Sequence, residues 1–335
     1  MKNLFFHIGF PKTGTTTLYD YVLPKTSGVD VFSPNTNYKI LQQTLTKKQF
    51  SDNLVVKDFL ESFLYSSNYN SAAINILLKS SNNNIFLSTV NLLAAQFFRG
   101  LYTNSKSYVT PELIADRINN VLSPSFNVKI IISIRHQSDW IPSAFAEWHR
   151  YISKKSGGKN FDKFCNMFLY PPSQFFLGLD YNHIVNIFEN KFDRKNLLLI
   201  FYEDLKENPR KFYSLLLNWI GANFEDYIFE SLPRKNNRSM PDGSKKLEKV
   251  NALNFLFGLK IKYFPNFRFK IIKNLPFIIN LLENVPLPSF KKEVFASPET
   301  LSSIFDAYLD SNKKLQYKFN DLPYQYYAND VNHKN

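Results

Sequence analysis

The sequence predicts an α/β fold with a doubly wound parallel sheet flanked by helices. Two segments, VKIIISI and LLLIF, are almost continuously apolar and rich in Ile and Leu, which is typical of parallel strands buried on both faces. Short runs of this kind alternate with longer stretches of helical periodicity. Such alternation favours a parallel sheet with helical crossovers over an antiparallel sheet.

The expected elements follow from this alternation in chain order. We expect strands at Asn3–Gly9, Val29–Ser33, Asn84–Ser88, Asn127–Ile134 and Asn196–Tyr202. We expect helices at Thr15–Leu23, Lys47–Leu64, Pro111–Val121, Ser138–Lys154, Phe161–Leu169, Asp180–Phe188, Pro209–Ile220 and Pro298–Leu315. The domain organisation predicted is a core of residues 1–245 and a helical C-terminal extension of residues 246–335 packed on it. Ligands of such sheets bind beyond the carboxyl ends of the strands, so the residues that follow each strand are the candidate site residues.

Composition excludes several classes of protein. The 335 residues are 44% hydrophobic and 21% charged, which rules out a disordered or fibrous chain. The single cysteine, Cys165, excludes an internal disulfide framework and a multi-cysteine metal site, and its apolar surroundings predict a core residue rather than a nucleophile. No run reaches the roughly 18 apolar residues of a membrane span, and no signal-peptide cleavage site follows the first residues. We therefore expect a soluble cytoplasmic protein.

The formal net charge of +13 is unevenly distributed. Residues 234–292 contain 13 basic and three acidic residues, a balance that favours an anionic partner. Within this stretch, residues 257–270 alternate aromatic and basic side chains, and the apolar run 277–282 follows them. Three interpretations stay open: a segment lying on an anionic membrane surface, a groove for an anionic saccharide, or helices packed on the sheet with solvated lysines. Nucleic acid is not expected because no recognition motif is present.

The segment GFPKTGTTTL, which starts at Gly9, forms a candidate phosphate loop. Two of the ten glycines bracket it with the spacing GxxxxG, and a helix is expected to follow. Backbone N–H groups in such a loop can surround an anion at the helix N-terminus. A nucleoside triphosphate loop has its lysine after the second glycine, whereas here Thr15 follows Gly14 and Lys12 lies inside the loop. The alternative is a threonine-rich helix cap without a ligand.

PKTGTTTL resembles the 5′-phosphosulfate loop of sulfotransferases that use 3′-phosphoadenosine 5′-phosphosulfate (PAPS). The resemblance implies that Lys12 contacts the 5′-phosphate and its bridging oxygen, and is the catalytic cation. It also implies that the following residues donate hydrogen bonds to the phosphate from backbone and hydroxyl groups: Thr13, Gly14, Thr15, Thr16 and Thr17. The loop would then be P-loop-like in shape but would hold a phosphosulfate.

A second element of the same family follows the strand Asn127–Ile134. The family places an arginine at the strand end and a serine eight residues later, and both bind the 3′-phosphate. Arg135 and Ser143 match in type and spacing, and an arginine suits a phosphate because its planar guanidinium can donate two parallel hydrogen bonds. Many members have proline two residues after the arginine, whereas this chain has Gln137. Without the loop, a helix-capping arginine would be an equal interpretation.

Two further segments resemble the family. YEDL at Tyr202 matches a family segment whose tyrosine lies near the adenine, while Glu203 and Asp204 are expected to favour the start of the next helix. The basic residues Lys235 and Arg238 fall where the family closes a loop over the cofactor. We expect them to contact the 3′-phosphate or to form a lid.

The resemblance implies in-line transfer of a sulfuryl group from PAPS to an acceptor hydroxyl, with release of PAP and without a metal. A saccharide or lipid-linked saccharide is the expected acceptor, and residues 257–282 would then place the enzyme at the inner membrane surface. The family has a Glu or His base where this chain has Val90 and Asn91, so His7 is the tentative base, with a core histidine as the alternative. A catalytically inactive PAP- or nucleotide-binding protein and a P-loop kinase-like phosphotransferase are the rival functions.

Overall fold

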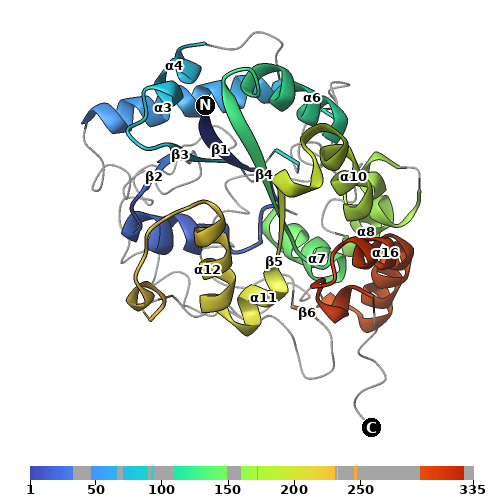
Figure 1. The fold of residues 1–335 in the computed structure, drawn as a ribbon. Helices are drawn as coiled ribbons and strands as arrows, with labels where there is room; N and C mark the ends of the chain where they lie inside the picture. The colour runs from blue at the N-terminus through green and yellow to red at the C-terminus, as the bar shows by residue number, and fades with distance from the viewer. Residues whose placement is uncertain are drawn as a thin grey trace, which may run out of the picture.

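The structure is a computed structural model, and it describes residues 1–32, 47–65, 71–89, 92–93, 109–148, 160–171, 173–230, 232, 245–246 and 295–327. In this part of the chain the main sheet has five strands in the order β2-β3-β1-β4-β5 (Figure 1). The strands are β1 Lys2–His7, β2 Val29–Phe32, β3 Asn84–Ser88, β4 Phe126–Ile134 and β5 Leu197–Phe201. All four neighbouring pairs are parallel. The predicted doubly wound parallel sheet is therefore confirmed.

The helices cover both faces of the sheet, as Figure 1 shows. Their bounds are α1 Thr15–Thr17, α3 Lys47–Tyr65, α4 Ala72–Leu78, α6 Pro111–Leu122, α7 Gln137–Trp148, α8 Phe161–Leu169, α9 Gln174–Leu177, α10 Tyr181–Phe192, α11 Tyr202–Glu207, α12 Pro209–Trp219 and α16 Pro298–Lys318. A π-helical turn at Leu18–Val22 and 3-10 turns at Leu23–Lys25, Arg194–Asn196, Asp226–Phe229 and Tyr324–Tyr326 complete them, with a short antiparallel pair of β6 Lys245–Lys246 and β7 Phe295–Ala296.

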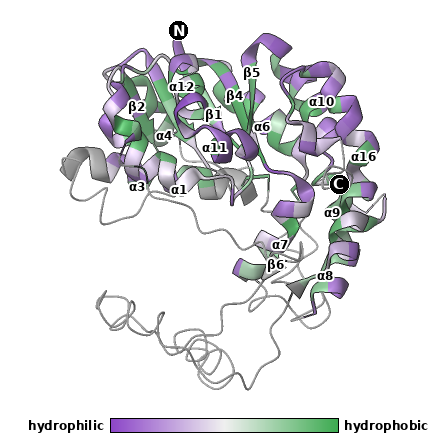
Figure 2. Cartoon of the chain, turned by 90° about the horizontal axis from the view of Figure 1, so that it is seen from below, coloured by the Kyte–Doolittle hydropathy of each residue, from purple (hydrophilic) through white to green (hydrophobic). Residues whose placement is uncertain are grey.

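Alternating side chains of the strands divide the core into two clusters. Leu4 and Phe6 of β1 pack on the face covered by α3, α6, α7, α10 and α16, whereas Phe5 packs on the face covered by α12. Figure 2 shows the resulting contrast between hydrophobic residues along the sheet and the hydrophilic surface of α11. Both faces are thus buried, as the continuously apolar strands predicted. Cys165 belongs to this core, and its burial raises the pKa of the thiol to about 12.

Several predicted bounds agree with the structure, and the differences have local causes. β3 and α8 have the predicted bounds. Five helices begin at a residue whose side chain accepts a hydrogen bond from the first turn. These N-cap residues are Thr110 for α6, Asn160 for α8, Asp180 for α10, Asn208 for α12 and Ser297 for α16. The predicted helix Thr15–Leu23 is instead an α-turn, a π-turn and a 3-10 turn that continue to Lys25. The short helices α4, α9 and α11 were not predicted, and Tyr202, expected in the last strand, is the first residue of α11. No helix in the described ranges combines the length and apolar character that crossing a bilayer requires.

Candidate functional site

The candidate site lies at the carboxyl ends of β1, β4 and β5. These three strands are neighbours in the sheet, so the segments that follow them meet at one edge. The loop with Lys12 follows β1, Arg135 follows β4, and Tyr202 follows β5 as the first residue of α11. The structure therefore brings together residues that lie far apart in the sequence.

The loop after β1 is held closely against β4. The Phe10 N–H donates to the carbonyl of Ser133 at 2.8 Å, and the indole Nε1 of Trp140 donates to the carbonyl of Pro11 at 2.9 Å. A Cβ on Gly9 would lie 2.4 Å from the backbone nitrogen of Ser133, a distance that no side chain tolerates. Glycine is therefore required at this position because two backbones approach each other.

The second half of the loop turns into α1 through two left-handed residues. Lys12 has a φ of 68° and Gly14 a φ of 82°, a region that glycine enters without steric cost. Gly14 is the N-cap of α1, and no side chain in the described part of the chain caps this helix. The first amides of a helix have no intrahelical partner, so this loop offers N–H donors to an anion.

The threonines of the loop fall into two groups. The Thr13 hydroxyl is buried, donates to the carbonyl of Phe10 at 2.6 Å and lies 2.9 Å from the hydroxyl of Ser133. This hydroxyl is engaged inside the protein, so only the backbone of Thr13 is suited to a ligand. The later threonines are half-buried or exposed at the loop surface: Thr15, Thr16 and Thr17.

Arg135 lies next to both other segments of the site. Its Nη1 donates to the carbonyl of Lys12 at 3.2 Å, its Cζ lies 4.3 Å from the centre of the Tyr202 ring, and its Nη2 lies 3.7 Å from Oδ2 of Asp139. Burial lowers the pKa of the guanidinium, although an arginine stays charged. Its Nε is buried and has no hydrogen-bond partner among the described residues. Ser143 is half-buried on α7, the helix that starts two residues after Arg135.

Two carboxylates of α7 neutralise cations at this edge of the sheet. Oδ2 of Asp139 lies 2.8 Å from Nζ of Lys206 on α11, and Oε2 of Glu147 lies 3.2 Å from Nζ of Lys12. Burial and the nearby charge of Arg135 lower the pKa of Lys206. Lys206 was not predicted from the sequence. Its helical spacing from the tyrosine of YEDL, four residues, is the signal that could have indicated it.

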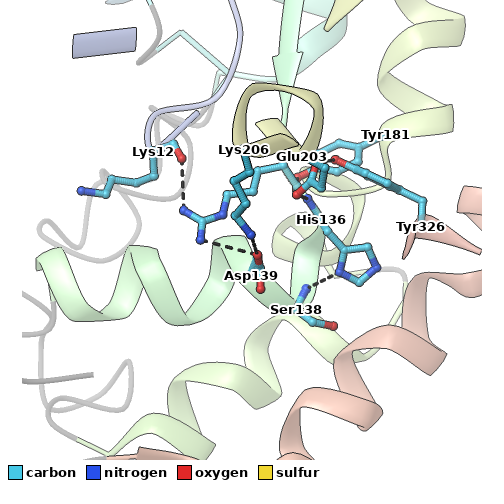
Figure 3. Close-up of polar contacts among 9 residues, drawn as sticks. Lys12, His136, Ser138, Asp139, Tyr181, Glu203, Lys206 and Tyr326 are labelled. Carbon is cyan, nitrogen blue, oxygen red and sulfur yellow. Dashed lines mark hydrogen bonds and ion pairs between the residues drawn. The ribbon is translucent and has the colours of Figure 1, made fainter. Parts of the chain in front are cut away.

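The peptide that carries Arg135 is held by buried polar side chains (Figure 3). The Tyr181 hydroxyl donates to the carbonyl of Arg135 at 2.6 Å. The His136 N–H donates to Oε1 of Glu203 at 3.1 Å, and the Tyr326 hydroxyl donates to Oε2 at 2.9 Å. Burial raises the pKa of Glu203, whereas the two hydrogen bonds lower it. We expected Glu203 to favour the start of a helix. Its main contacts are instead hydrogen bonds with two distant segments, through the His136 N–H and the Tyr326 hydroxyl.

Residues 3–252 match the family described as the sulfotransferase domain. The chain belongs to the sulfotransferase family. It is accordingly a sulfotransferase. No curated protein matches the chain.

Three solved sulfotransferase structures are similar to this chain, each at 16% sequence identity. The sulfotransferase from Alicyclobacillus acidocaldarius has a TM-score of 0.41 and covers 71% of this chain and 86% of its own. The sulfotransferase domain from the curacin biosynthetic pathway has a TM-score of 0.41, with 70% and 79% covered. A mouse sulfotransferase in complex with PAP has a TM-score of 0.39, with 84% of both chains covered.

His7 lies beneath the loop of this sulfotransferase and is completely buried. Its Nε2 lies 2.9 Å from the hydroxyl of Ser133, and its Nδ1 lies 3.0 Å from that of Ser88 and 3.2 Å from that of Tyr19. Burial lowers the pKa of the imidazole to about 3. These contacts favour the core histidine over the tentative base, since a base must reach the acceptor hydroxyl.

Some predicted site residues of the sulfotransferase lie outside the described residues. These are Val90 and Asn91 at the position of the family base, Lys235 and Arg238 of the basic loop, and the segment 257–282. Their roles stay predictions. The described residues contain no group of three or more His, Cys, Asp or Glu side chains that could hold a metal ion.

Proposed function

We propose that this sulfotransferase transfers a sulfuryl group from PAPS to the hydroxyl of a saccharide or lipid-linked saccharide. Family membership over residues 3–252 supports the reaction. One observation supports the assignment of the donor site: a largely buried guanidinium, that of Arg135 with 15% of its side chain exposed, lies against both the Lys12 loop and the Tyr202 ring. A buried cation of this kind is stabilised by an anion at hydrogen-bond distance.

The residues present fit a donor with two phosphate groups. The buried Nε of Arg135, which has no hydrogen-bond partner in the described part of the chain, is the kind of donor that a phosphate oxygen satisfies. We assign the 3′-phosphate to Arg135 and Ser143, with Lys235 and Arg238 closing over it, and the adenine to Tyr202. We assign the 5′-phosphate to Lys12 and to the amides and hydroxyls at the start of α1, where a helix N-terminus favours negative charge.

PAPS supplies the sulfuryl group. When the bond between its sulfur and the 5′-phosphate oxygen breaks, PAP leaves with the bonding electrons. Lys12 is the residue that neutralises the charge developing on the leaving oxygen, and such preorganised charge is the main source of catalysis in loose group transfer. Its ammonium pairs with Glu147, but both groups are partly exposed. Exposed ion pairs contribute about 0–1 kcal/mol, so Lys12 can exchange this carboxylate for a phosphate at little cost.

The acceptor assignment rests on charge and composition. A net charge of +13, concentrated in residues 234–292, supports an acceptor carried on or near an anionic surface. The alternation of aromatic and basic residues in 257–270 supports both sugar stacking and contact with a membrane surface. We therefore place the protein in the cytoplasm, at the inner membrane surface. Liposome flotation with and without anionic lipid tests this placement, and absence of binding to both would contradict it.

Calorimetric titration with PAP and with ADP tests the donor site, because ADP lacks the 3′-phosphate. We expect Arg135→Ala to weaken PAP binding by about 10–100-fold, the value of one or two hydrogen bonds to a charged group, and to leave ADP binding nearly unchanged. Arg210→Ala, an exposed arginine paired with Asp226, is the matched control. Equal affinity of the wild-type protein for PAP and ADP would contradict the proposal. PAP binding without sulfuryl transfer to any saccharide would favour the inactive PAP-binding protein.

A further inference from the structure

The turn that follows β4 is in contact with a segment far along the chain. This segment, residues 298–326, comprises α16 and the 3-10 turn Tyr324–Tyr326, and α16 packs against α7, α8 and α10. It lies beyond residues 3–252, which match the sulfotransferase domain. The turn, residues 135–138, begins with Arg135, the proposed 3′-phosphate ligand. The segment is therefore placed to influence the donor site without belonging to the matched family domain.

The first link joins Gln137 to Asn312 of α16. Nε2 of Gln137 donates to Oδ1 of Asn312 at 3.2 Å, and Nδ2 of Asn312 donates to Oε1 of Gln137 at 3.1 Å. Neither side chain is exposed to solvent. Gln137 also donates to the carbonyl of Leu179 at 3.0 Å. A buried amide pair that is satisfied in both directions restrains the two backbones, because a large shift would leave a buried polar group unpaired.

The second link joins Tyr326 to the backbone of His136 through Glu203. The Tyr326 hydroxyl and the His136 N–H donate to the two oxygens of the same carboxylate. The His136 ring packs between two rings of the segment, 5.7 Å from Phe305 and 5.1 Å from Tyr326. Tyr326 is completely buried, so this link is shielded from water.

A third link fixes the end of the turn. The Ser138 hydroxyl donates to the carbonyl of Leu301 at 3.1 Å. The segment thus contacts the three residues that follow Arg135, namely His136, Gln137 and Ser138. On the other side, Tyr181 holds the carbonyl of Arg135. The position of the Arg135 backbone is therefore determined by contacts from outside its own strand and helix.

We propose that residues 298–326 form part of the 3′-phosphate site, with Asn312 and Tyr326 as positioning residues that act through the turn on Arg135. This inference rests on the proposed function, since it assigns the 3′-phosphate to Arg135. The segment sets the direction in which the guanidinium meets the phosphate. Gln137, where many family members have proline, forms the two side-chain hydrogen bonds with Asn312 of this segment.

The test compares PAP and ADP affinities of two variants with one control. Tyr326→Phe keeps the ring and removes the hydroxyl that donates to Glu203, and Asn312→Ala removes the partner of Gln137. Tyr324→Phe, an exposed tyrosine of the same turn, is the control. We expect the ratio of PAP affinity to ADP affinity to fall by about 3–10-fold in both variants and to be unchanged in the control. ADP affinity of Tyr326→Phe should stay close to wild type at a temperature where the variant is folded, while its thermal midpoint falls because Oε2 of the buried Glu203 loses a donor.

The outcomes separate this inference from the proposed function. If Arg135→Ala lowers the PAP preference and Tyr326→Phe does not, the positioning role is overturned while the donor site stands. If Tyr326→Phe weakens PAP and ADP equally, the segment has a merely structural role and the inference is also overturned. If Arg135→Ala leaves the PAP preference unchanged, the donor-site assignment itself fails. Should Asn312→Ala not fold, Tyr326→Phe alone decides.

Discussion

The hydroxyl of Thr13 lies 2.9 Å from the hydroxyl of Ser133, which attaches the phosphate loop to β4 beneath it. Ser133 in turn lies 2.9 Å from Nε2 of His7, and Nδ1 of His7 lies 3.0 Å from Ser88 at the end of β3. This buried chain of polar groups joins the loop to three strands. It joins the buried side of the loop to the sheet, whereas Thr15, Thr16 and Thr17 are half-buried or exposed.

The two groups of threonines should respond differently to substitution. Thr13→Val removes a buried hydroxyl and leaves polar partners unpaired, so we expect it to lower the free energy of unfolding by about 1–3 kcal/mol. Thr16 is exposed, so Thr16→Val should change stability by less than about 0.5 kcal/mol and weaken PAP binding instead. Denaturant unfolding and calorimetric titration of both variants check this pattern. A stability loss confined to Thr16→Val would contradict it.

His7 should make the protein less stable in acid. Burial lowers its pKa to about 3, against about 6.5 in an unfolded chain, so between these values the folded state binds fewer protons than the unfolded state. The free energy of unfolding should therefore fall as the pH drops below about 6.5, by up to about 1.4 kcal/mol per pH unit. In His7→Gln this contribution should disappear. Denaturant unfolding at pH 7.5 and pH 5 measures it, with the partly exposed His183→Gln as control.

A second measurement on His7 tests its role in turnover. If His7 were the base, His7→Ala would lower turnover by about 10²–10⁴-fold with PAP binding intact. Its contacts with Ser88, Ser133 and Tyr19 predict instead that the main loss is in stability. Single-turnover transfer at a temperature where the variant is folded distinguishes the two.

Glu147 should compete with the donor for Lys12. Its Oε2 lies 3.2 Å from the Lys12 ammonium, so Glu147→Gln removes an internal anion from the place proposed for the 5′-phosphate. We expect PAP to bind about 2–5-fold more tightly, because a half-exposed ion pair contributes about 0–1 kcal/mol. Glu112→Gln, an equally exposed carboxylate beside His183, is the matched control. Weaker PAP binding by Glu147→Gln at low salt would show that the carboxylate orients Lys12 rather than competing for it.

The two glycines that bracket the loop should tolerate alanine to different degrees. A Cβ on Gly9 meets the backbone of Ser133 at 2.4 Å, and backbone cannot move aside, so we expect Gly9→Ala to cost about 3 kcal/mol or more. A Cβ on Gly14 meets Cδ2 of Leu205, the end of a flexible side chain. Gly14→Ala should lower the free energy of unfolding by about 1–2 kcal/mol, mainly because of the positive φ at this position. Relative to the loss of stability, PAP affinity should fall more in Gly14→Ala than in Gly9→Ala. Unfolding and titration of both variants measure the difference.

The fold was predictable because its signals are local. Continuous apolar runs indicate β4 and β5, and the two glycines with Lys12 between them indicate the loop. The contacts of Tyr326 with Glu203 and of Asn312 with Gln137 join residues 123 and 175 positions apart. No spacing rule connects such residues, since the path of the chain between them decides whether they meet. The division of the threonines was equally unpredictable, because the burial of Thr13 depends on Ser133 of a distant strand.

The position of β1 in the sheet has a consequence for synthesis of the chain. β1 lies between β3 and β4, so both of its neighbours are translated after it. Until residues 84–88 have left the ribosome β1 has no strand to pair with, and until residues 126–134 follow one edge of β1 stays unpaired. Non-local pairing of this kind is slow. Nascent chains that stall before β4 should therefore depend on chaperones and be degraded readily, whereas chains that have passed β4 can close the sheet.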